Sequence, residues 1–318
     1  MTGSGAKGGE ERPVARRLWA AGRTGLGPDA PRPRPGGRPG ARSRARGRVA
    51  DDVLGGLALL VAGLAYLLLI VPIVITAVMA FDARTYLGPL PPDDLSFRWF
   101  ARFFAEPLFI RGLETTLVVA VLAVGVSVAA GVATALFLDR YEFRGKEALA
   151  AFFVSPLVVP PVVIGFALLL FLAQLGIVDG FVRLLCGHMI LTVPYTIRAT
   201  LAGLVGIERS LTEAALNLGA TERDAFWEIT FPLARTGIIV GAVFGFAVSM
   251  DDVAVSMFLT DATTYTLPVA LVSSMRANFD LTIAAASLML IGVTVALILV
   301  LDRLVGLNRV IGQGIYKT

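Results

Sequence analysis

The segment SLTEAALNLGATERDAFWEITFP, residues 210–232, is a polar stretch between two long apolar regions. Ser210 and Glu213 have the spacing of a capping box, in which a hydroxyl and a carboxylate satisfy unpaired amides at a helix start. Gly219 lies where a left-handed residue commonly ends a helix. Between them the apolar residues repeat at i, i+3, i+4 and i+7, which predicts one stripe along a helix of about two turns: Leu211, Ala214, Ala215 and Leu218.

A second short helix is predicted directly after this glycine. Thr221 and Asp224 repeat the capping spacing, and Pro232 is expected to break the helix that they start. A second apolar stripe lies between them, formed by Ala225, Phe226 and Ile229. The residues alone are equally compatible with a connecting loop and with a docking element made of two capped helices.

Composition places the chain among integral membrane proteins. Of its 318 residues, 56% are apolar and 16% are charged, which is outside the range of soluble globular domains. Residues 1–50 hold 12 basic and 3 acidic residues, whereas the remainder holds 16 basic and 21 acidic. The single cysteine, Cys186, excludes an intrachain disulfide and a cysteine-based metal cluster.

The N-terminal residues 1–50 are predicted to be a disordered cytoplasmic tail, because they are rich in Arg, Pro and Gly and lack an aliphatic run. A basic block directly before an apolar run is better explained by membrane orientation and anionic lipid than by nucleic acid. We therefore expect the lipid bilayer as a partner and no nucleic acid.

Long uncharged runs predict the membrane spans. A short interfacial helix is expected at residues 97–104, and the third run should be kinked or broken because it contains Pro156, Pro160 and Pro161. The four clear runs are Val53–Phe81, Thr115–Leu138, Ala148–Val178 and Leu281–Leu301.

Two further runs are too short for hydropathy to decide. Only 14 residues separate Arg183 from Arg198, and only 15 separate Arg235 from Asp251. Counting both runs gives six spans and rejecting both gives four. Either number places the two termini on one side, and the basic tail places that side in the cytoplasm.

The opening segment resembles the EAA loop of binding-protein-dependent ABC importer permeases. The resemblance rests on Glu213-Ala214-Ala215, on Gly219 and on Pro232. Three more segments resemble the spermidine/putrescine (PotC-like) permease subfamily: SPLVVPP at 155–161, VPYTIRATLAGL at 193–204, and SMDDVAVSMF at 249–258 followed by TLP at 266–268. The Arg-rich extension has no counterpart in this pattern.

This resemblance implies an all-α, six-helix transmembrane domain over residues 51–306, with the type I ABC importer permease fold. Its EAA loop, residues 206–233, would form a cytoplasmic coupling helix, and residues 307–318 a cytoplasmic tail. The implied assembly in the bacterial inner membrane contains a second permease subunit as a heterodimer, two ATP-binding subunits and an external solute-binding protein. The residues expected to couple to the ATPase are Glu213, Ala214, Ala215, Leu218, Gly219 and Pro232.

The chain itself lacks an ATP-binding loop. Its one Gly-Lys pair, Gly145-Lys146, is followed by Glu147 instead of Ser or Thr, so ATP and Mg²⁺ are expected on a partner ATPase and the chain is not expected to be an enzyme. His188, the only histidine, has no metal-like cluster in the sequence around it and is expected to pack or hydrogen-bond within a span.

Asp251 and Asp252 are candidates for the translocation path, because a carboxylate within a span costs about 2.5–3.5 kcal/mol and usually faces a path or a partner. An equally weighted alternative is that one of them caps a break in its span. The implied substrate is spermidine or putrescine; ferric iron, phosphonate or another small solute is the alternative within the class. A secondary carrier or channel is an alternative of another class, which inverted repeats would favour.

Overall fold

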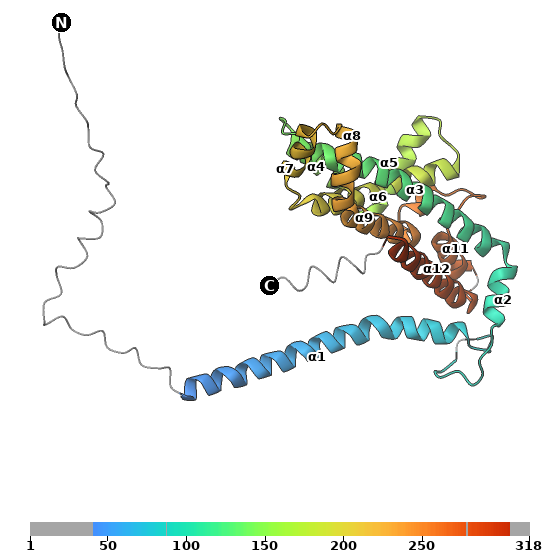
Figure 1. Ribbon diagram of the computed structural model, residues 1–318. Coiled ribbons are helices and arrows are strands. Elements are labelled where there is room, and N and C mark those ends of the chain that lie inside the picture. The colour runs from blue at the N-terminus through green and yellow to red at the C-terminus, as the bar shows by residue number, and fades with distance from the viewer. Residues whose placement is uncertain (1–40, 87, 278, 306–318) are drawn as a thin grey trace, which may run out of the picture. The chain divides into compact units, whose positions relative to one another are not determined.

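The structure is a computed structural model that describes residues 41–86, 88–277 and 279–305. These residues form helices joined by turns and loops (Figure 1). The chain divides into two units, residues 1–66 and residues 67–318. The described part of the first unit belongs to helix α1, Ala41–Ala80, and the second unit holds the end of α1 and the other helices.

The second unit contains an ordered series of helices of very different lengths. The long ones are candidates for membrane spans, and the short ones lie at their ends. In chain order they are α2 (Arg98–Ala105), α3 (Pro107–Arg140), α4 (Lys146–Val154), η2 (Ser155–Leu157), α5 (Pro161–Gln174), α6 (Gly180–Leu204), α7 (Arg209–Asn217), α8 (Glu222–Ala225), η3 (Phe226–Thr230), α9 (Phe231–Asp251), α10 (Ser256–Leu259), α11 (Leu267–Ala277) and α12 (Thr282–Val305).

The predicted six-span architecture is confirmed. Within the described residues, five helices are long and apolar enough to cross a membrane, and the bent pair α4–η2 and α5 makes a sixth if it is one span. Its two parts meet at 103°, as the prolines in this run predicted. The two runs that hydropathy left open are real helices, α6 and α9. Half of the apolar window of α6 is buried inside the protein, and His188, Thr192 and Thr196, which lower its hydropathy, are among the buried residues.

Several boundaries differ from the prediction. The interfacial helix is confirmed as α2, but α3 begins at Pro107, eight residues before the predicted span, since proline is favourable in a first helical turn. Residues 41–50, predicted to be part of the disordered tail, are helical in α1, because Ala and Arg are good helix formers. Residues 1–40 and the predicted tail at 307–318 lie outside the described residues.

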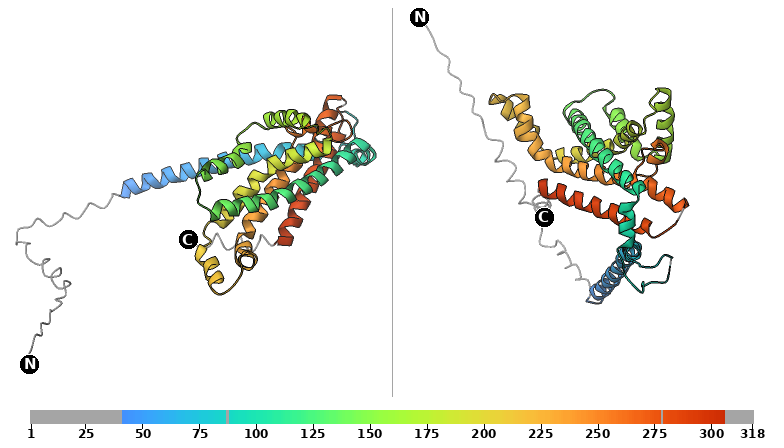
Figure 2. Two further views of the ribbon diagram at one scale, coloured as in Figure 1. Left: turned by 90° about the horizontal axis from the view of Figure 1, so that it is seen from above. Right: turned by 90° about the vertical axis from the view of Figure 1, so that its right-hand side faces the viewer.

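Helices α3, α6 and α9 lie side by side and form the centre of the second unit (Figure 2). Small residues let the backbones of α6 and α9 come close together. A Cβ atom added to Gly203 would lie 2.8 Å from the Cα of Gly237, and one added to Gly241 would lie 2.9 Å from the Cα of Thr196. In a membrane, such close packing replaces the hydrophobic driving force that joins helices in water.

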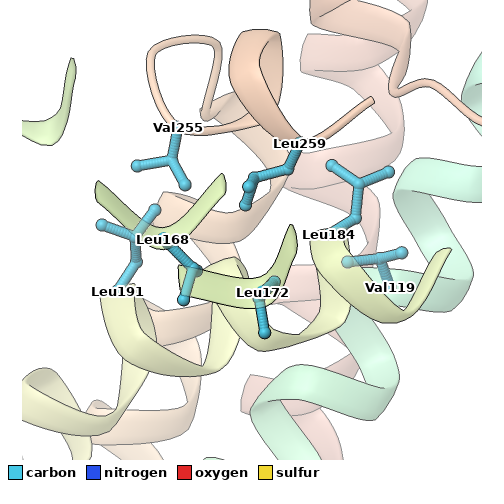
Figure 3. Close-up of a cluster of buried hydrophobic side chains, with 7 residues drawn as sticks. All are labelled: Val119, Leu168, Leu172, Leu184, Leu191, Val255 and Leu259. Carbon is cyan, nitrogen blue, oxygen red and sulfur yellow. The ribbon is translucent and has the colours of Figure 1, made fainter. Parts of the chain in front are cut away.

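An apolar cluster covers one side of this centre (Figure 3). It joins the broken span α5 and the short helix α10 to α3 and α6. The buried members are Val119 from α3, Leu168 and Leu172 from α5, Leu184 and Leu191 from α6, Val255 directly before α10, and Leu259 from α10. The cluster therefore fixes the segment that follows α9 onto the bundle.

The glycine contact between α6 and α9 can be tested with two alanine substitutions. Gly241→Ala should lower the midpoint of thermal unfolding of the purified chain in detergent, because overpacking against backbone atoms costs about 1–3 kcal/mol. Gly125 on α3 has no heavy atom within 4 Å of the corresponding position, so Gly125→Ala should leave the midpoint unchanged or raise it. Equal shifts in both variants would contradict the role of this contact.

Candidate functional site

The polar segment forms a helical hairpin at one end of the bundle, opposite the end that carries α2 (Figure 1). Helix α7 closes with a left-handed Gly219, whose φ is 95°. The Gly219 amide donates to the Leu216 carbonyl at 3.0 Å, and the Ala220 amide donates to the Ala215 carbonyl at 3.0 Å. These two bonds are the pair that defines a Schellman motif. The predicted turn at Gly219 is confirmed.

The predicted capping box at the start of α7 is wrong. The N-cap residue is Glu208, in an extended conformation, and no side chain caps the helix. Ser210 lies inside the first turn, where its hydroxyl donates to a carboxylate oxygen of Glu208 at 3.0 Å. Because the helix begins before Ser210, this hydroxyl cannot take the N-cap position that the spacing to Glu213 suggested.

The second predicted capping box, Thr221 with Asp224, is confirmed. The Asp224 amide donates to Thr221 Oγ1 at 3.2 Å, and the Thr221 amide donates to Asp224 Oδ2 at 3.1 Å. The Thr221 hydroxyl also donates to Asp224 Oδ2 at 2.6 Å. The hydrogen bonds from this hydroxyl and from the backbone amide hold the pKa of Asp224 below its ordinary value of 3.8. The hairpin thus has a well-formed cap on its second helix.

The predicted break at Pro232 is also wrong. Helices α8, η3 and α9 form one continuous run from Glu222 to Asp251. The middle part, η3, is a π-helical turn in which the Phe231 amide donates to the Phe226 carbonyl. Pro232 follows directly after this π-helical turn, as the second residue of α9, and the helix continues through it. The hairpin is therefore connected to a membrane span by unbroken helix.

The first apolar stripe of the hairpin is largely uncovered within the described chain. Leu218 is 89% exposed and Leu211 is 47% exposed, whereas Ala225 in the second helix is buried. Glu213 and Ala214 are exposed, and Ala215 is half-buried. An exposed pair of aromatic rings, Trp227 and Phe231, was missed by the sequence reasoning. Their spacing of four residues on a helix is the signal that could have shown a common face.

A groove of about 260 Å³ lies where the hairpin meets the ends of α3 and α6. Arg140 and Tyr141 at the end of α3, Glu208 before α7, and Thr212 and Glu213 on α7 contribute to its lining. Of the predicted coupling residues, Glu213 therefore lines this groove. Leu218 and Gly219 do not line it.

The two adjacent aspartates have different surroundings. Asp251 ends α9 and is exposed. Asp252 follows the last residue of α9 and has an extended backbone. Its carboxylate accepts hydrogen bonds from the amide and the hydroxyl of Ser256, both at 2.8 Å. It also accepts one from the Val255 amide at 3.3 Å. These bonds support the interpretation that Asp252 caps the break, and they leave Asp251 as the candidate for the path.

His188 is fully buried on α6, and its ring nitrogens join two serines that sequence reasoning missed. Its Nδ1 lies 2.7 Å from Ser249 Oγ, and its Nε2 lies 3.0 Å from Ser256 Oγ. The prediction that His188 hydrogen-bonds within a span is confirmed. Among the described residues, no three His, Cys, Asp or Glu side chains are grouped as a metal ion would require.

The described helices thus form a bundle of candidate membrane spans with a helical hairpin at one end, which is the architecture of an integral membrane protein. The fold agrees with solved structures. One chain in the crystal structure of a bacterial alginate ABC transporter in complex with alginate pentasaccharide-bound periplasmic protein has a TM-score of 0.64 and 17% identity to this chain. The match covers 80% of this chain and 95% of that chain.

Residues 127–309 match the family of binding-protein-dependent transport system inner membrane components, and the chain belongs to this family. The chain is 30% identical to the spermidine/putrescine transport system permease protein PotC of Haemophilus influenzae, over 76% of this chain and 92% of the relative. It is 28% identical to the putrescine transport system permease protein PotI of Escherichia coli, over 62% of this chain and 73% of that relative.

Proposed function

We propose that this chain is a permease subunit of an ATP-driven importer that carries spermidine or putrescine into the cytoplasm. The observation that carries this proposal is the 30% identity to a spermidine/putrescine permease, which extends over nearly the whole of that relative. The exposed carboxylate of Asp251 at the end of a span is compatible with a cationic substrate.

The proposed assembly contains a second, different permease subunit, two ATP-binding subunits and an external solute-binding protein. ATP and Mg²⁺ would bind to the ATP-binding subunits, so this chain would transport without hydrolysing ATP itself. Six spans return the chain to its starting side, and the Arg-rich residues 1–50 favour the cytoplasm for both termini. With this orientation the α7–α8 hairpin is cytoplasmic and Asp251 lies toward the outer side.

The α7–α8 hairpin is proposed as the element that docks on the ATP-binding subunit. Two observations support this role. Its first helix leaves Leu218 exposed, and a short helix of this kind is stabilised by docking against a partner. Its second helix continues into α9, so a displacement of the hairpin moves a membrane span. In this proposal Ala214 and Ala215 let the partner surface approach closely, Gly219 shapes the turn, and Pro232 lies in the helix that transmits the motion.

The substrate is tested by reconstituting the whole complex with its ATP-binding subunits and binding protein in proteoliposomes. Uptake and substrate-stimulated ATP hydrolysis should respond to spermidine or putrescine. A panel that includes ferric iron, phosphonate and other small solutes supplies the controls. Stimulation by one of these solutes and not by a polyamine would overturn the substrate assignment while leaving the permease family unchanged.

Docking of the hairpin is tested by Gly219→Asp. This variant should insert normally but separate ATP hydrolysis from uptake, because an L-residue at a φ of 95° distorts the turn at the partner surface. Gly145, in the loop between α3 and α4, has a φ of 93° and makes Gly145→Asp a matched control with the same backbone strain. We expect the ratio of uptake to ATP hydrolysis to fall in the Gly219 variant only. Normal coupled transport by it would remove the docking assignment.

The role of Asp251 is tested by neutralising each acid separately. Asp251→Asn should lower the polyamine uptake of each assembled complex, because it removes a charge from the proposed path. Asp252→Asn should instead lower the amount of assembled complex, because it weakens the cap before α10. Uptake is measured at several substrate concentrations and divided by the amount of complex. Asp93→Asn, which neutralises an exposed loop carboxylate, is the control. Unchanged uptake in the Asp251 variant would contradict the proposal that this carboxylate lines the path.

A further inference from the structure

A buried network of hydrogen bonds around His188 connects four helices, α3, α6, α9 and α10. On one side, Ser249 near the end of α9 contacts Nδ1 of the ring, and on the other side Ser256 at the start of α10 contacts Nε2. Ser249, Ser256 and His188 are at most 1% exposed. Thr192, one turn further along α6, bonds to the His188 carbonyl and also to Ser127 of α3, at 2.8 and 2.6 Å.

The directions of these bonds follow from the number of protons available. A serine hydroxyl has one proton, and that of Ser256 is donated to Asp252 Oδ2 at 2.8 Å. The Ser256 oxygen can therefore only accept from His188, so Nε2 is the donor. Nδ1 is then left to accept the hydroxyl proton of Ser249 at 2.7 Å. Every polar atom in this series has a defined role, which is how buried networks specify one arrangement.

The two serines lie on opposite sides of the break between α9 and α10. Asp251 lies between them in the sequence, so the histidine holds the chain before and after this carboxylate. The apolar cluster of Figure 3 also presses Val255 and Leu259 onto α5 and α6. Apolar packing is non-directional, so it tolerates small sliding movements. The hydrogen bonds of His188 fix the orientation and the register of this segment against α6, which the apolar contacts alone do not.

We propose that His188 is a positioning residue that holds the α9–α10 break against α6 and thereby sets where the Asp251 carboxylate lies. The proposal rests on the proposed function, in which Asp251 lines the path of a cationic substrate. His188 itself touches no substrate. Its effect passes through Ser249 and Ser256 to the segment that carries Asp251.

Three variants test this role in the complete complex with its ATP-binding subunits and binding protein. His188→Phe keeps an aromatic ring but removes both bonds, and His188→Gln keeps one donor and one acceptor. Thr200→Val is the matched control, because the Thr200 hydroxyl is buried on the same helix and has no hydrogen-bond partner among the described residues. The readouts are substrate transported per ATP hydrolysed and amide hydrogen exchange over residues 252–258.

His188→Phe should lower the transport ratio about tenfold, which corresponds to the loss of about 1.4 kcal/mol. It should also raise the exchange of the Val255 and Ser256 amides, which are protected by the hydrogen bonds that they donate to the Asp252 carboxylate. His188→Gln should restore both readouts to within about twofold of the native complex, and Thr200→Val should change neither. A ratio that stays native in His188→Phe while the amount of complex falls would show a purely packing role and overturn the proposal.

Two further outcomes separate this proposal from the proposed function. If the native complex transports no polyamine, the substrate assignment fails, but amide exchange needs no substrate and still tests His188. If His188→Phe does not assemble, Ser249→Ala removes only the bond to Nδ1. Raised exchange at residues 252–258 in that variant supports the positioning role, and unchanged exchange overturns it.

Discussion

The close approach of α6 and α9 is the contact on which the rest of the bundle depends. Lipid is as apolar as leucine, so helices in a membrane associate through tight packing and interhelical hydrogen bonds rather than by hiding from water. Here the backbones meet at Gly203, Gly237 and Gly241, where a Cβ atom would collide with the facing helix. The hairpin lies at one end of this pair and the break after α9 at the other. Both candidate sites therefore depend on the same contact.

The continuous helix from Glu222 to Asp251 connects the hairpin to the break after α9. Thirty helical residues span about 45 Å at 1.5 Å per residue. A π-helical turn before Pro232 lets the chain pass a proline without breaking, so the hairpin and Asp251 belong to one run. The end of that run is then held by His188 and by the apolar cluster around Val255. In the proposed docking role, a movement at the hairpin would therefore reach a segment that the hydrogen bonds of His188 hold against α6.

The two capping patterns in the hairpin were not equally predictable from the sequence. Ser210 with Glu213 and Thr221 with Asp224 have the same spacing, yet only the second pair forms a capping box. Which residue becomes the N-cap depends on where the backbone leaves its extended conformation, and Glu208 does so before Ser210. The left-handed Gly219 was predictable because few other residues tolerate its φ of 95°.

The sequence by itself determined the membrane class, the clear spans, the proline-broken third span and the turn of the hairpin. These follow from hydropathy and from backbone preferences, which are properties of short segments. Hydropathy left four or six spans open and the resemblance implied six, but only the tertiary structure showed why α6 is a helix of the bundle despite its polar residues: His188, Thr192 and Thr196 are buried against neighbouring helices. It also separated Asp251 from Asp252 and joined His188 to Ser249 and Ser256, which lie 61 and 68 residues away in the chain. Such contacts depend on how the helices pack, and no local pattern encodes them.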